Sequence, residues 1–165
     1  MTGPVLLPVA DRRTPLLLGV YGTLRRGCRN SHLMAGCPPV ADGVVAGVLH
    51  EVRASLRLDY GYPLLQVASG SDRTGGADVV GEVLVEVYRV LDTPTLDALD
   101  ELEDYDPDDP AGSEYVRVRV PVRARGGGPV AGVPEVQVYA YAGAADGRGA
   151  VLPGGDWYVH AGPLR

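Results

Sequence analysis

The chain of 165 residues contains no phenylalanine and no lysine. Without phenylalanine, its aromatic residues are nine tyrosines and one tryptophan, so valine, leucine and alanine must supply most of the core. Without lysine, its 15 basic residues are all arginines, and 21 acidic residues outnumber them. A net charge of -6 excludes the broad basic surface that binding to a phosphate backbone requires, so we expect no nucleic-acid partner.

Cysteines and long apolar runs are also scarce. The two cysteines, Cys28 and Cys37, form no Cys-x-x-Cys pair, which argues against a disulfide framework and against a zinc or redox motif. The apolar run after Arg12-Arg13 ends at Val20, too early for the core of an export signal, and no run of about twenty apolar residues could span a membrane. We therefore expect a cytoplasmic protein with reduced thiols and no membrane partner.

Glycine and proline are abundant, with 23 and 14 residues, and this favours many turns between short strands. The predicted strands are residues 16–21, 44–50, 81–88, 115–123 and 136–141. The clearest helix is predicted to begin at Thr93 as its N-cap and to end before Pro107. The sequence thus predicts an α+β fold, a small curved mixed sheet or β-barrel with few short helices. We expect one domain over residues 15–165 after a flexible leader of residues 1–14.

The predicted strand of residues 115–123 has a strict alternation. Four valines at even positions alternate with Arg117, Arg119, Pro121 and Arg123 at odd positions. Because neighbouring side chains of a strand point to opposite faces, this pattern predicts one apolar face and one mostly charged face. Pro121 places the strand near the edge of its sheet.

One carboxylate of the predicted helix falls on its apolar side. At about 100° per residue, Glu103 lies about 20° from Leu96 and about 40° from Leu99, whereas Asp97, Asp100, Glu101 and Asp104 fall outside this stripe. Burying a carboxylate costs several kcal/mol and raises its pKa, which suits general acid–base catalysis. Two other interpretations stay open, in which Glu103 faces water at a frayed helix end or pairs with an internal arginine.

The segment from Tyr21 to Gly27 places a glycine turn directly after a buried strand. Gly22 can adopt backbone angles forbidden to other residues, and the N–H groups that follow it can converge on an anion. An ordinary exit from a strand fits the same pattern. A nucleotide-binding loop is excluded because Cys28-Arg29 stand where such a loop needs Lys-Ser or Lys-Thr.

These motifs together resemble the gamma-glutamylcyclotransferase-like family, which includes gamma-glutamylamine cyclotransferases and a deprotecting enzyme of aminoglycoside biosynthesis. The resemblance covers residues 16 to 157 in the order of the family. It rests on Tyr21-Gly22-Thr23-Leu24-Arg25-Arg26-Gly27 with Asn30, Gly81-Glu82-Val83, Leu99-Asp100-Glu101-Leu102-Glu103-Asp104-Tyr105, Tyr115-Val116-Arg117 and Gly155-Asp156-Trp157. This sequence departs from the family pattern at Asp104, where glycine is commoner, and in an apparent added loop at residues 69–77.

The resemblance implies an enzyme that acts on a small-molecule gamma-glutamyl amide. The α-amine of the glutamyl group attacks its own γ-carbonyl, and 5-oxoproline and a free amine are released. The catalytic base of the family falls on Glu103, and its substrate-binding residues fall on Tyr21, Gly22, Thr23, Leu24 and Tyr115. Whether Arg26 contacts the substrate stays open, as does the identity of the leaving amine.

Two other functions fit the same residues. One is a non-catalytic small-molecule binding protein of the same fold, and the other is a carboxylate-dependent hydrolase that pairs Glu103 with a neighbour such as Glu82. We expect no cofactor and no metal, since His32, His50 and His160 have no spacing typical of metal ligands. Both a monomer and a homodimer are compatible with the sequence.

Overall fold

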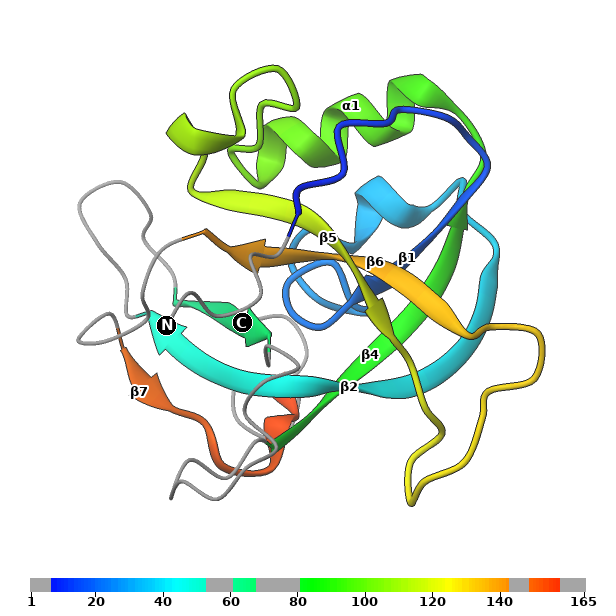
Figure 1. The fold of residues 1–165 in the computed structure, drawn as a ribbon, viewed down its shortest axis with the longest axis vertical. Coiled ribbons are helices and arrows are strands. Elements are labelled where there is room, and N and C mark those ends of the chain that lie inside the picture. The colour runs from blue at the N-terminus through cyan, green and yellow to red at the C-terminus, as the bar shows by residue number, and fades with distance from the viewer. Residues whose placement is uncertain (1–6, 53–60, 68–80, 143–148, 158–165) are drawn as a thin grey trace.

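The fold is a curled mixed sheet with one α-helix (Figure 1). The computed structural model describes residues 7–52, 61–67, 81–142 and 149–157. The strands are β1 (Leu16–Val20), β2 (Pro39–Val52), β3 (Tyr62–Val67), β4 (Gly81–Val90), β5 (Tyr115–Pro121), β6 (Glu135–Tyr141) and β7 (Ala150–Val151). The helices are α1 (Thr93–Leu102) and the 3₁₀ turns η1 (Ser31–Met34), η2 (Pro110–Gly112) and η3 (Pro153–Gly155). The predicted α+β class is confirmed.

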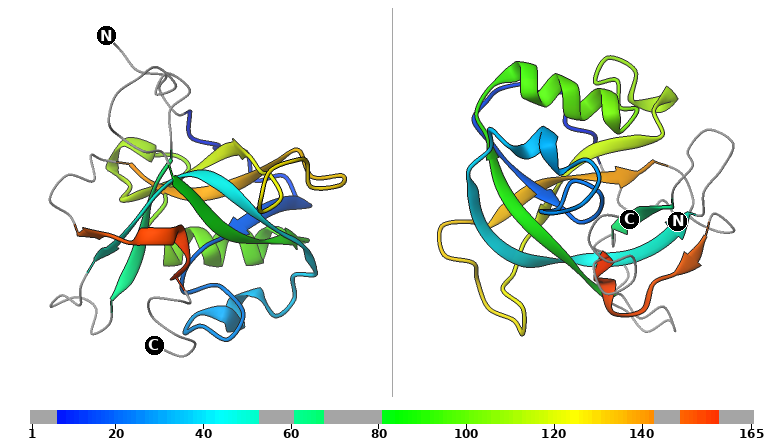
Figure 2. Two further views of the ribbon diagram at one scale, coloured as in Figure 1. Left: turned by 90° about the horizontal axis from the view of Figure 1, so that it is seen from below. Right: turned by 180° about the vertical axis from the view of Figure 1, so that it is seen from behind.

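The strands follow the order β3-β2-β4-β1-β6-β5, and β7 pairs with β2. All of these pairs are antiparallel except β1 with β6, which is parallel. The chain just after β5 returns to β2, where Val44 and Arg123 exchange two backbone hydrogen bonds of 2.8 and 3.0 Å. This seam joins two strands that are distant in the sheet order, so the sheet curls round on itself (Figure 2).

The seam depends on a glycine in β2. A Cβ atom at Gly43 would lie 2.7 Å from the Cγ2 atom of Val122 and 2.9 Å from the backbone oxygen of Arg123. Any side chain at this position would therefore push the two strands apart.

Valine and leucine fill the inside of the curl, as the composition predicts. Leu18, Val87 and Val138 are fully buried on three adjacent strands. Leu96 and Leu99 of α1 are also fully buried and belong to the same core. None of the helices in the part of the chain described above is long and apolar enough to cross a membrane.

Several boundaries differ from the sequence predictions. β2 begins at Pro39, earlier than predicted, and has an irregularity between Pro39 and Ala41. The short strands β3 and β7 were not predicted. The N-cap of α1 is Asp92, whose carboxylate accepts a 2.8 Å hydrogen bond from the Thr95 N–H, so the prediction of Thr93 was wrong by one residue. The loop predicted at residues 69–77 lies outside the described residues.

The described part of the predicted leader packs against the domain. The Val9 side chain is buried, and its N–H donates a 2.7 Å hydrogen bond to the backbone oxygen of Arg117. The Val9 oxygen accepts a 3.0 Å hydrogen bond from the Tyr105 hydroxyl. The division into a leader and one domain stays a prediction, but this stretch is held in place at Val9.

Candidate active site

A cavity of about 100 Å³ lies between the segment that follows β1 and the end of α1. Residues from distant parts of the sequence line it: Gly19, Val20, Tyr21, Gly22, Thr23, Leu24, Asn30, Tyr62, Pro63, Leu102, Glu103, Asp104, Glu114, Tyr115 and Tyr139. All six residues predicted for catalysis or substrate binding are in this set. Arg26 and Glu82 are not, and each lines a different surface depression.

Glu103 is the first residue after α1. The sequence analysis had placed it inside the helix, which ends earlier than predicted. The N–H of Asp104 donates to the Glu101 oxygen at 3.2 Å, and the N–H of Tyr105 donates to the Asp100 oxygen at 2.9 Å. This pair of bonds is the Schellman ending of a helix, and it requires a left-handed residue, here Asp104 with a φ of 51°. The turn brings the chain sharply away from the helix axis while Glu103 stays on the cavity wall.

The environment of Glu103 disfavours its charge. The residue keeps some exposed surface towards the cavity, and its carboxylate accepts no hydrogen bond from the residues that the structure describes. Burial first, and repulsion from the Glu114 carboxylate second, raise the pKa of Glu103 from 4.5 to about 7. Near neutral pH the group can therefore both accept and release a proton.

The segment opposite Glu103 is a pair of tight backbone turns. The Arg25 N–H donates to the Gly22 oxygen at 3.0 Å, and Asn30 donates to Thr23 twice, from its backbone N–H at 2.9 Å and from its amide at 3.0 Å. Within the described part of the chain, the N–H groups of Gly22, Thr23 and Leu24 donate to no acceptor. These three donors are therefore available to a ligand in the cavity.

Gly22 is needed for a different reason from the one its sequence context suggests. Its φ is not in the left-handed region, so backbone freedom is not what the position uses. Instead, a Cβ atom on Gly22 would collide with the ring of Pro63, which lies on β3 and also lines the cavity. Close approach of the two segments thus excludes any side chain at this position.

Two buried tyrosines brace the cavity. The Tyr21 hydroxyl donates a 2.6 Å hydrogen bond to the Tyr139 backbone oxygen, and the Tyr115 hydroxyl donates to the Pro63 oxygen at 3.4 Å. Burial is the largest cause of a raised pKa at both tyrosines, and the charge of Glu103 adds to it. Both hydroxyls therefore stay protonated at physiological pH, and Tyr115 is a neutral donor at the cavity wall.

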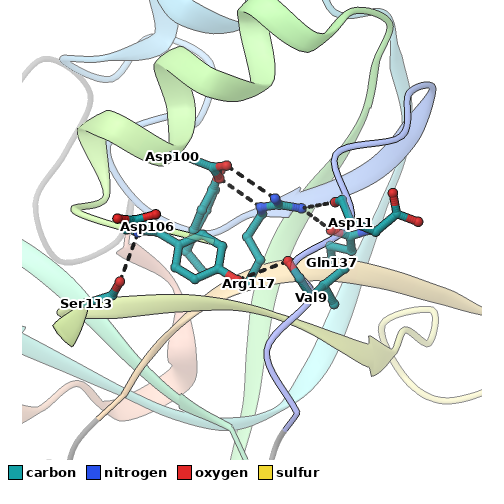
Figure 3. Close-up of polar contacts among 9 residues, drawn as sticks. Val9, Asp11, Asp100, Asp106, Ser113, Arg117 and Gln137 are labelled. Carbon is teal, nitrogen blue, oxygen red and sulfur yellow. Dashed lines mark hydrogen bonds and ion pairs between the residues drawn. The ribbon is translucent and has the colours of Figure 1, made fainter. Parts of the chain in front are cut away.

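A buried ion pair fixes the last turn of α1. Arg117 donates to Asp100 through Nε at 2.8 Å and through Nη2 at 3.2 Å (Figure 3). The Tyr139 hydroxyl donates to the same carboxylate at 2.6 Å. The sequence analysis placed Asp100 outside the buried stripe and Arg117 on a mostly charged face, but both side chains are buried. Two features of the sequence could have indicated the pair: Asp100 follows the buried Leu96 by four residues, and Arg117 lies on a strand as a possible partner of opposite charge.

The family described as gamma-glutamyl cyclotransferase, AIG2-like, matches residues 18–159 of the sequence. The chain belongs to this family. The match includes every residue of the cavity wall, from Gly19 to Tyr139. No curated protein sequence matches the chain significantly.

Solved structures share the fold of this gamma-glutamyl cyclotransferase-like chain at low sequence identity. A uropathogenic Escherichia coli-specific protein has a TM-score of 0.58 and 20% identity, over 93% of this chain and all (100%) of its own. An uncharacterized protein from Pyrococcus horikoshii has a TM-score of 0.56 and 19% identity, over 87% and 91% of the two chains. An AIG2-like protein from Mus musculus has a TM-score of 0.54 and 24% identity, over 81% and 82%. These similarities support the fold.

Sequence reasoning missed several residues of the cavity wall in this family member. Tyr139 comes from β6, and Glu114 comes from the loop before β5. Glu114 matters electrostatically because it is the second cause of the raised pKa of Glu103. Among the described residues, no group of three or more histidine, cysteine, aspartate or glutamate side chains is arranged to hold a metal ion.

Proposed function

We propose that this protein is a gamma-glutamylcyclotransferase that cleaves a gamma-glutamyl amide into 5-oxoproline and a free amine. The observation that carries the proposal is the position of Glu103, a carboxylate with a pKa of about 7 on the wall of the cavity that Gly22, Thr23 and Leu24 also line. Membership of the family supports the class of reaction, and the cavity supports the assignment of residues.

Positioning of the substrate is the main task of the site. The N–H groups of Gly22, Thr23 and Leu24 bind the α-carboxylate of the glutamyl group, and Tyr115 closes the pocket beside it. The substrate is folded so that its α-nitrogen lies about 3 Å from its γ-carbon. Such an intramolecular geometry lowers the activation free energy by on the order of 7–11 kcal/mol. No nucleophile from the protein is needed.

Glu103 moves the protons of the reaction. Its carboxylate removes a proton from the α-ammonium, and the neutral amine then attacks the γ-carbonyl and forms the new C–N bond of the lactam. As the tetrahedral intermediate collapses, Glu103 gives this proton to the departing nitrogen and the original amide C–N bond breaks. The attacking nitrogen loses its second proton to the regenerated carboxylate, which passes it to the released amine or to solvent, so the lactam nitrogen keeps one hydrogen. A backbone N–H that faces the developing oxyanion would stabilise it by about 3 kcal/mol.

Two carboxylates in one cavity make hydrolysis the second candidate. Glu103 and Glu114 both line the cavity. Glu82, the partner suggested by the sequence, is an exposed residue of β4 and lines a different surface depression. A hydrolase would activate water with one carboxylate and release free glutamate. A non-catalytic binding protein of this fold would release neither product.

The product of the reaction separates these three functions. We would incubate the protein with a panel of gamma-glutamyl amides and identify the products by mass spectrometry. Glu103→Gln keeps the shape of the side chain but removes the base, and we expect a loss of 5-oxoproline release of about 10²–10⁴-fold. Glu101→Gln is the matched control, because Glu101 is an exposed carboxylate at the same end of α1. Free glutamate as the product, or full activity in folded Glu103→Gln, would contradict the proposal.

A further inference from the structure

The proposed substrate-binding segment lies beyond the strand that leads into it. β1 ends at Val20, whose partner on β4 is Glu86, and residues 21–26 follow without a strand neighbour of their own. The turns within this segment set its shape, but they do not set its position relative to Glu103. The Tyr21 hydroxyl ties the first residue of the segment to Tyr139 on β6, and a further contact holds the residues that follow.

Arg25 makes that contact from beneath the segment. Its side chain is only 9% exposed, its Nε donates to Glu86 at 2.9 Å, and its Nη1 donates to Asp156 at 2.8 Å. Its backbone N–H also closes the turn at Gly22. One residue therefore ties the turn that carries the free N–H groups to two separate carboxylates.

Glu86 strengthens the attachment with further bonds. Its carboxylate accepts the backbone N–H of Arg26 at 3.2 and 3.3 Å and the Tyr88 hydroxyl at 3.1 Å. Its side chain is 10% exposed, so solvent cannot easily replace these bonds. Asp156 is the residue directly after η3, so the cluster joins the segment after β1 to the last described turn of the chain.

We propose that Glu86 and Asp156 are positioning residues, which act through Arg25 to hold the backbone donors at Gly22, Thr23 and Leu24 in place for the glutamyl carboxylate. This proposal rests on the proposed function for its catalytic readout only. Neither carboxylate lines the cavity, so neither touches the substrate. Each neutral isostere removes one of the two carboxylates that Arg25 binds and so loosens the segment.

The kinetic test uses Glu86→Gln and Asp156→Asn with one gamma-glutamyl amide. Because the segment binds the carboxylate equally in the ground state and the transition state, we expect KM to rise about tenfold while kcat changes much less. Arg25→Lys, which keeps the charge, should raise KM less than either carboxylate variant does. Glu135→Gln removes a carboxylate from an exposed ion pair with Arg119 and should leave KM unchanged.

A stability-matched control separates positioning from general destabilisation. Val118→Ala creates a void in the core at β5, away from the cavity wall, and should lower Tm without raising KM. An unchanged KM in both folded carboxylate variants, or an equal rise in Val118→Ala, would overturn the proposal.

Hydrogen exchange tests the same idea without requiring activity. The amides of residues 22–24 should exchange about tenfold faster in Glu86→Gln and Asp156→Asn than in the wild type, and Val118→Ala should not share this local change. If no variant, including the wild type, releases 5-oxoproline, the proposed function fails while this measurement still decides the attachment. Unaltered exchange at residues 22–24 would refute the attachment whatever the enzyme does.

Discussion

The pKa of Glu103 links catalysis to stability at a single residue. The carboxyl has a pKa of about 7 in the folded protein and 4.5 as its ordinary value, so between these pH values the folded state binds more protons than the unfolded state. Stability from this group is therefore complete below about pH 4.5 and falls as the pH rises through 7. The ionised carboxylate, which is the form that acts as the base, is therefore the form that the folded protein destabilises.

Glu103→Gln should therefore stabilise the protein above about pH 7, where Glu103 is ionised in the wild type. The shift corresponds to a cost of up to about 3 kcal/mol for the ionised form, which glutamine does not pay. Urea denaturation at about pH 8 should show the gain, and at about pH 4 the two proteins should have nearly equal stability. Equal stability at both pH values would show that Glu103 titrates normally.

Glu114 should set the pH at which the enzyme becomes active. Repulsion from this carboxylate is the second cause of the raised pKa of Glu103, so Glu114→Gln lowers that pKa. In the wild type we expect kcat/KM to increase with pH around a midpoint of about 7, as Glu103 loses its proton. In Glu114→Gln the midpoint should move to lower pH. The pH–rate profiles of the two proteins check this, and an unmoved midpoint would contradict it.

At the scale of the elements, the ending of α1 carries a strained residue. Asp104 adopts a φ of 51°, which glycine accepts without cost and other residues adopt at a cost of about 1 kcal/mol. The sequence already indicated this position as a departure from the family pattern. Asp104 also lines the cavity, so its replacement affects both the strain and the local charge.

Asp104→Gly should raise the free energy of unfolding by about 1 kcal/mol through relief of this strain. Asp104→Ala, which removes the same charge but keeps a Cβ atom, is the matched control and should give no such gain. Thermal denaturation of both variants at one pH tests the explanation. A similar gain in the alanine variant would assign the effect to charge.

The same element shows what the sequence could and could not predict. The apolar spacing of Leu96 and Leu99 is local, and it correctly located the helix and a carboxylate near the cavity. Asp100 follows Leu96 by four residues and so lies about 40° from it around the helix. What the spacing does not reveal is its partner Arg117, which lies on a strand and reaches the helix only in the folded protein. The N-cap was misplaced because Asp92 and Thr93 are both good capping residues.

At the scale of the whole molecule, the predicted strands were placed well and the curved sheet was predicted, but the residues that join its two ends were not. Valine-rich runs bounded by glycine and proline are local signals, and they located β1, β4, β5 and β6. No periodic pattern in the sequence indicates the seam between Val44 and Arg123. The one residue that reflects it is Gly43, whose missing side chain lets the two segments approach closely. The catalytic roles of the cavity residues stay predictions.

Gly43→Val should open the seam. The new side chain would overlap Val122 and the backbone of Arg123, and overpacking of this kind costs about 1–3 kcal/mol. Gly36→Val is the matched control, since a Cβ atom at Gly36 has no neighbour within 4 Å. A lower denaturation midpoint only in Gly43→Val would support the role of the seam, and equal midpoints would exclude it.

The packing of Val9 and Asp11 sets a limit on how far the chain can be shortened. The backbone oxygen of Asp11 accepts a 3.2 Å hydrogen bond from Arg117, the arginine that also fixes the turn before Glu103 (Figure 3). A protein trimmed to begin at Pro15 would keep every strand and every residue of the cavity wall, yet it would lose this acceptor and the cover over Tyr105. For protein engineering, a shortened protein should therefore keep Val9 and Asp11.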